Sequence, residues 1–449
     1  MRFKQKVLFR VGGLFKGQSL RAQLIRGGAG SLMIKFGNAL LAFAVAVVMA
    51  RTLGPEGYGV YSFALAIIMM VAIPAQIGVP QLIVRETAKA QASGNFGLMR
   101  GLWRWGNVAV AILSALGLVM VGSAILFTDI GGEGARAATL TIGIALIPVI
   151  ALANVRGACL RGLRKVVKGQ LPESIIRPAL LLALLLVWKG GGIEDGLSPQ
   201  RAMVFYMVAA IFAFLAGWGL LYRSRPAELR ARPAAEYQLL AWRKAVIPLG
   251  LIAGLHLING YADLIILGFY RPDDDIGIYR AVSQLALLII FGLQAINQVL
   301  HPHFARLYTN RELDRLQHLV TTSARVVLVL ALFPFCVFLF IGEEILSFVF
   351  GSEYAVGTIA LVLLSFGQLA NAAFGSVGAL LNMTGHERDT VRGMLVAMVV
   401  NVALNFVLVP VYGINGAAIA TAISYLLWNA VLRYFVRKRL CIESAAFHF

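Results

Sequence analysis

Long apolar stretches limit what this chain can fold into more than any other feature of its sequence. About twenty consecutive apolar residues are enough for a helix to cross the hydrocarbon core of a bilayer. Twelve such stretches occur, at roughly 31–51, 58–80, 105–127, 137–157, 171–189, 202–222, 245–269, 277–300, 325–350, 356–381, 392–411 and 414–434. Only 14% of the 449 residues are charged, which is too little to hydrate the surface of a soluble protein of this length. The sequence predicts an all-α, multi-pass membrane protein with twelve transmembrane helices.

The positions of Lys and Arg predict how these helices are oriented. With the N-terminus in the cytoplasm, the inner segments carry 32 of the 40 basic residues and the outer loops carry 5. Cytoplasmic loops of membrane proteins have such an excess. Both termini are therefore predicted to be cytoplasmic. The same distribution accounts for the net charge of +19, so nucleic acid is not predicted as a partner.

The polar segments divide the chain into five parts. Residues 1–30 contain seven basic and no acidic side chains, and they predict a cytoplasmic amphipathic arm that lies on anionic headgroups rather than a cleaved signal peptide. The longest polar linker, 223–244, falls after the sixth predicted helix. We expect a six-helix N-terminal lobe at 31–222, a six-helix C-terminal lobe at 245–436 and a cytoplasmic tail at 437–449.

A short motif occurs once in each predicted lobe. RTLGPEGYGVYS (51–62) has an echo in FYRPDDDIGIYRA (269–281), and Gly277 follows Gly59 by 218 residues. CLRGLRKVVKG (159–169) and NMTGHERDTVRG (382–393) form a second pair at a similar offset. Two lobes in the same orientation are parallel repeats, and transporters of this kind bind substrate between the lobes and alternate access by rocking one against the other.

Five charged residues inside the predicted helices are singled out as candidates: Lys35, Glu173, Arg177, Asp263 and Arg280. A charge at the centre of a membrane helix costs about 2.5–3.5 kcal/mol on insertion scales, so each is a candidate for function. Glu173 and Arg177 are predicted to pair at i, i+4 spacing. Asp263 and Arg280 are predicted to pair near the outer surface as a gate or coupling site. The alternatives are a snorkelling Lys35 and static ion pairs.

Several neutral residues extend this set. His256 lies close enough to Asp263 in sequence to titrate with it, although a core histidine is the alternative. Asn259 and Asn405 are candidates for binding sugar hydroxyls, and hydrogen bonds between helices explain them equally well.

Four arginines are predicted to lie in the inner loops: Arg85, Arg156, Arg161 and Arg164. They serve topology and headgroup contact, or they form a cytoplasmic entrance for an anionic lipid-linked substrate. The sequence has no metal-ligand spacing and no nucleophile–base spacing, and its three cysteines are scattered. No catalytic residue, metal or cofactor is predicted.

Three segments resemble the polysaccharide flippases, the Wzx-type branch of the multidrug/oligosaccharidyl-lipid/polysaccharide (MOP) exporter superfamily. They are ARTLGPEGYGVYSFALAIIMMVAIPAQIGVPQLIVRETAK (50–89), YADLIILGFY with GIYRA (261–281) and LLNMTGHERDTVRGMLVAMVVNVALNFVLVPVYGINGAAIATAISYLLWN (380–429). Together the resemblance covers residues from about 30 to 435. It implies an arrangement like that of multidrug and toxin extrusion (MATE) transporters.

The resemblance also implies a cargo. Family members move undecaprenyl-diphosphate-linked oligosaccharide from the cytoplasmic to the periplasmic leaflet of the bacterial inner membrane, for O-antigen, capsule or exopolysaccharide assembly. A polysaccharide polymerase and chain-length machinery are implied as further partners. Cavity cations such as Lys35, Arg177 and Arg280 would bind the diphosphate or acidic sugars.

Two other functions stay open at this point. A MATE-type cation-coupled multidrug antiporter from the same superfamily is the first, although the stretch 31–51 has none of the buried carboxylates typical of such transporters. A membrane polysaccharide polymerase or ligase is the second, although the outer loops are short. The lipid II flippases are a further related branch.

Overall fold

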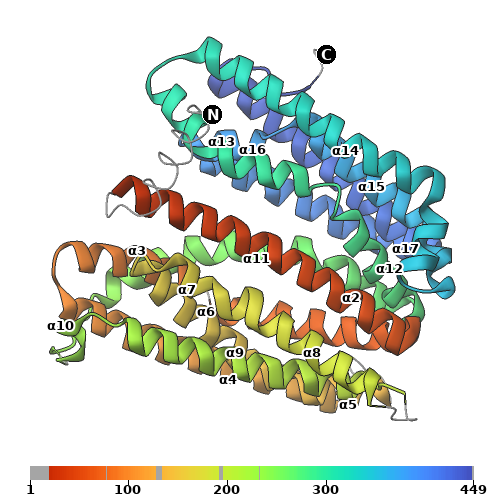
Figure 1. The fold of residues 1–449 in the computed structure, drawn as a ribbon, viewed down its shortest axis with the longest axis horizontal. Coiled ribbons are helices and arrows are strands. Elements are labelled where there is room, and N and C mark those ends of the chain that lie inside the picture. Colours follow the sequence, from red (N-terminus) through yellow and green to blue (C-terminus); the bar gives the residue numbers. More distant parts are fainter. Residues whose placement is uncertain (1–19, 77, 128–133, 192–195, 232, 447–449) are drawn as a thin grey trace, which may run out of the picture.

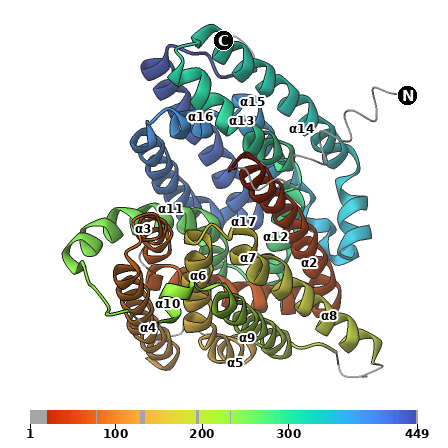
Figure 2. The same ribbon diagram turned by 60° about the vertical axis from the view of Figure 1, so that its left-hand side comes forward.

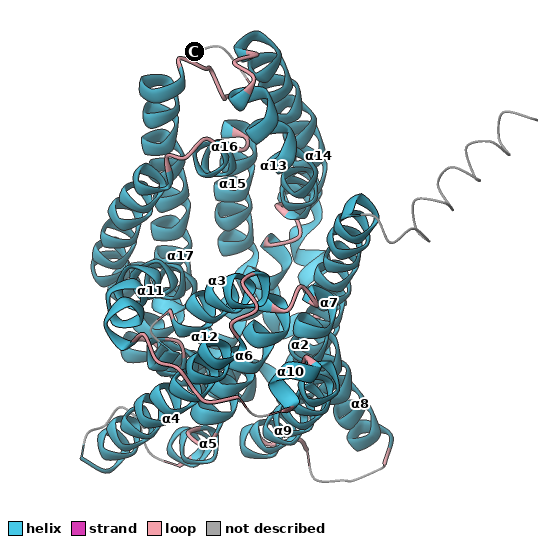
Figure 3. Ribbon diagram, turned by 90° about the vertical axis from the view of Figure 1, so that its left-hand side faces the viewer, coloured by secondary structure: helices cyan, strands magenta, loops and turns pink. Residues whose placement is uncertain are grey.

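The computed structural model describes residues 20–76, 78–127, 134–191, 196–231 and 233–446, and these residues are helical with short connections and contain no strand (Figures 1 and 3). Most of the basic arm predicted at 1–30 lies outside this part of the chain. Within the described residues, eight helices are long and apolar enough to cross a membrane. The prediction of an all-helical, multi-pass membrane protein is confirmed.

The N-terminal half contains α2 to α9. In chain order these are α2 (Leu20–Ala72), the 3-10 turn η1 (Pro74–Gln76), α3 (Val79–Ala92), α4 (Phe96–Phe127), α5 (Ala135–Gly143), α6 (Leu146–Gly162), α7 (Val166–Leu171), the π-helical turn η3 (Pro172–Ile176), α8 (Arg177–Gly190) and α9 (Pro199–Ser224). The short helix α10 (Ala227–Arg230) belongs to the linker.

The C-terminal half begins within α11 (Leu239–Tyr270). It continues with α12 (Asp273–Ala286), α13 (Phe291–Thr309), α14 (Leu313–Val349), η4 (Ser352–Gly357), α15 (Thr358–Phe374), α16 (Val377–Met383) and α17 (Glu387–Leu440). Figure 2 shows α13 to α17 gathered on one side of the molecule and the N-terminal half on the other, with α11 lying against α3. The contact of Gly78 with Val246 and Leu249 agrees with this placement of α11.

Two of the longest helices each hold two predicted spans, separated by a glycine. In α2 the break is at Gly54, whose φ of 68° lies in the left-handed region, and Pro55 then opens the second segment. Proline suits a first helical position because its nitrogen has no proton to leave unpaired. In α17 the break is at Gly413, with φ 55°. The Leu-Gly-Pro motif is thus a reversal between two consecutive helices, as predicted.

The linker and the tail are packed rather than extended. Residues 233–236 lie along α4, where a Cβ added at Gly97 or Gly101 would meet the carbonyl oxygen of Ala234 or of Glu236 at 2.7 and 1.7 Å. The backbone after α17 also folds back, because Glu443 pairs with Arg433 and with Arg437. Both segments therefore belong to the folded body.

The two halves meet at one end of the molecule. In Figure 1 they converge where α2 and α12 cross, and they diverge toward the end that carries α10 and α16. Buried side chains from both halves form one core cluster around this crossing, including Tyr58 and Phe63 of α2 with Ile276 and Tyr279 of α12. Away from that end, cavities separate the halves.

Candidate functional site

Two adjoining cavities lie between the halves, and Asn38 of α2 lines both of them. The cavity nearer the crossing has a volume of about 250 Å³, and the larger one beside it has a volume of about 650 Å³. Polar side chains from both halves point into them. This pair of cavities, called here the central cavity, is the candidate site.

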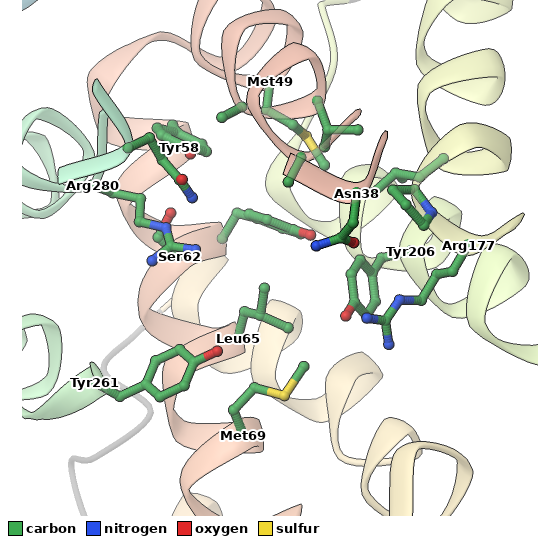
Figure 4. Close-up of a pocket in the computed structure, with 17 residues that line it drawn as sticks. Asn38, Met49, Tyr58, Ser62, Leu65, Met69, Arg177, Tyr206, Tyr261 and Arg280 are labelled. Carbon is green, nitrogen blue, oxygen red and sulfur yellow. The ribbon is translucent and has the colours of Figure 1, made fainter. Parts of the chain in front are cut away.

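Two arginines lie on opposite sides of the smaller part of the central cavity (Figure 4). Arg177 enters from the start of α8 and stacks over the ring of Tyr206, 5.4 Å from its centroid. Arg280 enters from α12 and lies beside Tyr58 and Ser62. Among the described residues that line this part, none is acidic. The arrangement suits an anionic group held between two guanidinium groups.

Glu173 fixes the position of Arg177. Its Oε2 accepts a hydrogen bond from Arg177 Nη1 at 3.1 Å, and its Oε1 accepts one from Arg156 Nη2 at 2.9 Å. The predicted Glu173–Arg177 pair is confirmed. Glu173 lies in the π-helical turn η3, and such turns change the direction in which side chains leave a helix. One carboxylate therefore holds two arginines from different helices.

The polar side chains that line the larger part of the central cavity are neutral except for one lysine, and apolar residues form the rest of its wall. Lys35 of α2 faces α13, from which Gln294, Asn297 and His301 project, and Asn382 and Trp428 complete the wall. The predicted residues Lys35, Arg177 and Arg280 thus all line the central cavity. Amide and indole groups are suited to hydrogen bonding and stacking with sugars.

Asp263 lies in a polar cluster of the C-terminal half. Its Oδ2 accepts hydrogen bonds from Tyr279 at 2.8 Å and from Thr421 at 2.5 Å, and its Oδ1 accepts one from Asn405 at 2.8 Å. The predicted pairing of Asp263 with Arg280 is wrong, because Arg280 on the same helix as Tyr279 turns toward the central cavity. Neutral donors satisfy the carboxylate instead.

The amide groups around Asp263 leave two acceptors unused. The Oδ1 atoms of Asn401 and Asn405 are buried and have no hydrogen-bond partner among the described residues. A small cavity of about 190 Å³ beside the cluster is lined by Asn259 and Asp263, and it also reaches Arg280. Buried amide oxygen atoms without donors can serve as ligands for a small cation, and the neighbouring carboxylate of Asp263 can take up a proton.

The repeated motif closes the end where the halves meet. A Cβ added at Gly59 would lie 1.8 Å from the carbonyl oxygen of Asp273, and one added at Gly277 would lie 2.0 Å from that of Pro55. Asp273 follows Pro55 by 218 residues, and Gly277 follows Gly59 by the same number. The two contacts are therefore equivalent under the repeat. The helices can approach this closely only because both positions are glycine.

Side chains reinforce this closure. Arg136 of α5 pairs with Asp273 of α12 at 2.7 Å, and Arg51 donates to the carbonyl oxygens of Phe348 and Val349. The hydroxyl group of Tyr354 donates to Ala50 O at 3.0 Å. Burial raises the pKa of Asp273 above its ordinary value, while Arg136 acts to lower it. We call the contacts of Gly59, Gly277, Arg51, Arg136 and Asp273 the outer gate, after the side of the membrane on which the sequence-based prediction places them.

The remaining predicted residues lie apart from the central cavity. Arg156 is not in a loop as predicted but within α6, where it is 5% exposed, because its guanidinium group packs on Phe214 and pairs with Glu173. Arg161 and Arg164 lie at the end of α6, and Arg85 pairs with Glu86 on α3. His256 falls in α11, but its side chain lies outside the described part of the structure. The roles of these residues stay predictions.

Sequence reasoning missed the aromatic wall of the central cavity. Tyr58, Tyr206 and Tyr261 line it, and Tyr58 belongs to the repeated motif. The repeat could have drawn attention to Tyr58, but Tyr206 and Tyr261 are single tyrosines among many apolar residues. Arg51 and Arg136 were visible only as outer basic residues, and their partners are more than 130 positions away.

Comparison with known families gives two matches. The model of the polysaccharide biosynthesis protein family matches residues 24–308, and that of the lipid II flippase MurJ matches residues 278–448. Together the two matches extend over both halves.

Individual relatives agree with these matches. The chain is 24% identical to a protein of Haloferax volcanii named "Probable low-salt glycan biosynthesis flippase Agl15", over 85% of this chain and 77% of the relative. It is 22% identical to the capsular polysaccharide biosynthesis protein CapF of Staphylococcus aureus, over 89% of this chain and 96% of the relative.

Solved structures show the same fold. The inward-facing conformation of a multidrug resistance MATE family transporter of the MOP superfamily superimposes with a TM-score of 0.73 at 15% identity, covering 90% of this chain and 94% of that chain. The lipid II flippase MurJ in its inward closed conformation gives a TM-score of 0.72 at 14% identity, covering 90% and 87%. Both neighbours are in inward conformations.

Proposed function

This chain belongs to the polysaccharide biosynthesis protein family within the MOP superfamily, and from that premise we propose that it is a flippase for lipid-linked oligosaccharide that works by alternating access. The relatives it matches include named glycan flippases. It is a transporter rather than an enzyme, so the polymerase and ligase alternatives are not favoured.

The proposed topology has twelve crossings with both termini in the cytoplasm. Each of the twelve apolar stretches coincides with a helix, a helix pair or one segment of a broken helix, which supports the count. The excess of basic residues in the inner segments supports the orientation. With this orientation, the outer gate is closed and the central cavity lies on its cytoplasmic side.

The proposed cargo is an oligosaccharide on undecaprenyl diphosphate, moved from the cytoplasmic to the periplasmic leaflet of a bacterial inner membrane. O-antigen, capsule or exopolysaccharide assembly would use the product, and a polymerase with chain-length machinery would act on it next. The observation that carries the proposal is the pair Arg177 and Arg280, which line one cavity from opposite halves. Two guanidinium groups suit a diphosphate, while the prenyl tail stays in lipid.

The larger part of the central cavity would hold the sugars. Its amide groups and Trp428 offer hydrogen bonds and a stacking surface without fixed negative charge. A multidrug antiporter that carries cations would instead need carboxylates facing its cargo, and the described lining residues of the central cavity include none. That alternative is less well supported by the chemistry of the cavity, although MATE transporters share the fold.

Asp263 is the proposed coupling residue. It is a membrane-embedded carboxylate whose hydrogen-bond partners among the described residues are neutral, beside two amide oxygens without donors. Taking up a proton or a monovalent cation there would change the contact between α11, α12 and α17, which carry the cluster. The Asp263→Asn variant is expected to lose any dependence of transport on the cation gradient while keeping its fold.

The test is a sidedness assay in cells that lack the protein. A membrane-impermeant lectin or glycosidase reports how much lipid-linked oligosaccharide faces the periplasm. Wild-type protein should restore this fraction, and Arg177→Ala and Arg280→Ala should each reduce the rate about 10- to 100-fold, because hydrogen bonds to charged groups contribute about 1.5–3 kcal/mol. Arg315→Ala is the matched control, since Arg315 is 79% exposed and pairs at the surface.

The other outcomes separate the alternatives. If drug efflux falls while sidedness stays normal, the protein is a multidrug antiporter. If sidedness is normal and the chains are only shorter or unligated, it is an assembly protein. If the protein restores sidedness and both arginine variants match the control, the flippase function stands and the diphosphate site must lie elsewhere.

A further inference from the structure

A second basic pocket lies outside the central cavity, on the flank of the N-terminal half. It has a volume of about 530 Å³ and is bordered by α4, α6, the end of α9 and the linker. We call it the flank pocket. Arg100 and Arg104 of α4, Arg156 of α6 and Arg225 after α9 line it, and no described residue in its lining is acidic. Four guanidinium groups around one opening need an anionic occupant or strong hydration.

Two of these arginines have buried nitrogen atoms without a partner. Arg156 is 5% exposed; it donates to Glu173 and to the carbonyl oxygen of Phe214, yet its Nε has no acceptor among the described residues. The Nε of Arg225 is also buried and has no hydrogen-bond acceptor among the described residues. An unpaired donor in a buried position costs about 1–3 kcal/mol, so a built site that leaves two of them open is arranged for a ligand with acceptor oxygens.

A glycine makes the room for this arrangement. A Cβ added at Gly217 of α9 would lie 2.4 Å from both Nε and Cζ of Arg156. The guanidinium group of Arg156 therefore fits between α6 and α9 at this glycine. Its Cζ atom lies 5.0 Å from the centroid of the Phe214 ring. Any larger residue at 217 would displace it.

The surroundings of the flank pocket are those of a membrane surface. Trp218 and Tyr222 of α9 are 56% and 64% exposed at this end of the helix, and Trp218 lines the pocket. Farther along α4 the exposed side chains are apolar, among them Val108 and Ile112. Exposed Trp and Tyr next to an apolar surface are typical of the headgroup region, so the pocket opens at the edge of the lipid-facing surface on the linker side.

We propose that the flank pocket binds the phosphate headgroup of an anionic phospholipid from the leaflet on the linker side. Phosphate oxygens would accept from Arg104, Arg225 and the Nε of Arg156, and the acyl chains would lie on the exposed apolar surface of α4 and α9. A lipid-borne phosphate could also come from the prenyl diphosphate cargo. The pocket is separated from the central cavity by Glu173, which contacts Arg156 on one side and Arg177 on the other, so a resident bilayer lipid is the occupant we assign.

The test is native mass spectrometry of the purified full chain with defined lipids. Phosphatidylglycerol should bind with one tight site that phosphatidylcholine does not fill. The double variant Arg104→Gln/Arg225→Gln should bind phosphatidylglycerol at least about tenfold more weakly. The matched control is Arg223→Gln/Arg230→Gln, which removes the same charge from two exposed arginines of the same segment that do not line the pocket.

The outcomes distinguish the sources of the phosphate. Equal binding of the two phospholipids, or equal loss in the control variant, would overturn the proposal. Displacement of phosphatidylglycerol by an equimolar amount of undecaprenyl diphosphate would overturn it in favour of a waiting site for cargo. If the double variant does not fold, the single variant Arg104→Gln decides, because the Arg104 side chain is exposed and its removal leaves the helix packing unchanged.

Discussion

Glu173 is the counter-charge of two arginines of the N-terminal half. It is the shared partner of Arg156, which faces the flank pocket, and of Arg177, which faces the central cavity. A buried arginine that loses its counter-charge is costly, and here one substitution would affect two of them. The carboxylate therefore matters more for folding than either arginine alone.

Glu173→Gln should accordingly lower the free energy of unfolding by about 3–5 kcal/mol, the range for breaking a buried ion pair. Thermal unfolding of the detergent-purified protein, together with the fraction that reaches the membrane, measures the loss. Arg177→Gln is the comparison, because it removes one partner and leaves the Arg156–Glu173 pair intact. If the two variants are equally stable, the shared carboxylate has no special role.

Asp273 predicts a pH dependence of the outer gate. In the closed gate, burial raises the pKa of its carboxyl group above the ordinary 3.8, with Glu56 and Asp274 adding to the rise against Arg136. In an open gate the group faces water and keeps its ordinary value. The closed state then binds the proton more tightly, so the closed population should grow as pH falls toward the raised pKa.

Distances between spin labels placed across the outer gate would measure that population as a function of pH. Asp273→Asn should give a population that no longer responds to pH in this range. A wild-type gate that opens on acidification would show that the ion pair with Arg136, rather than burial, controls the titration.

At the scale of single residues, sequence reasoning reached the charged cavity positions and missed their surroundings. Lys35, Arg177 and Arg280 stand out because charge is rare in membrane helices. Tyr206 and Asn38 do not, because polar and aromatic residues in such helices are common. The Asp263–Arg280 pairing was wrong because depth in the membrane does not give the direction in which a side chain leaves its helix.

At the scale of elements, α2 and α12 cross at two glycines that leave no room for a side chain. Gly277→Ala should place a Cβ against Pro55 O and open the outer gate, shifting the equilibrium by about 1–3 kcal/mol as overpacking does elsewhere. The rate of transport should fall as the closed gate becomes less stable. Labelling of a Ser62→Cys variant by a membrane-impermeant thiol reagent added from outside should become faster.

Gly219→Ala in α9 is the control, because a Cβ there meets nothing within 4 Å. The same labelling rate in Gly277→Ala and Gly219→Ala would mean that the helices separate elsewhere when the gate opens.

The apolar stretches predicted the elements well, since length and hydropathy alone locate a membrane helix. They did not predict the π-helical turn at Pro172–Ile176. Glu173 of this turn pairs with Arg156 of α6, a contact between distant parts of the chain that hydropathy does not reveal.

At the scale of the whole molecule, the contacts between halves and the cavities occupy opposite ends. The contacts of the outer gate join the halves at one end, and the charged pair Arg177 and Arg280 lines a cavity between the halves. The repeat in the sequence predicted that the substrate would lie between two lobes. It could not predict which side is open, because one sequence serves every conformation of a transport cycle.

The contact of Gly59 with Asp273 and of Gly277 with Pro55 is the kind of contact that two identical subunits make across a two-fold axis, each giving what it receives. The two halves should then associate even without the peptide bond that connects them. Fragments 1–237 and 238–449, when expressed together, should associate in the membrane and copurify. The pair should also restore transport, which neither fragment should restore alone. Such a chain descends most simply from a gene whose product once assembled with itself.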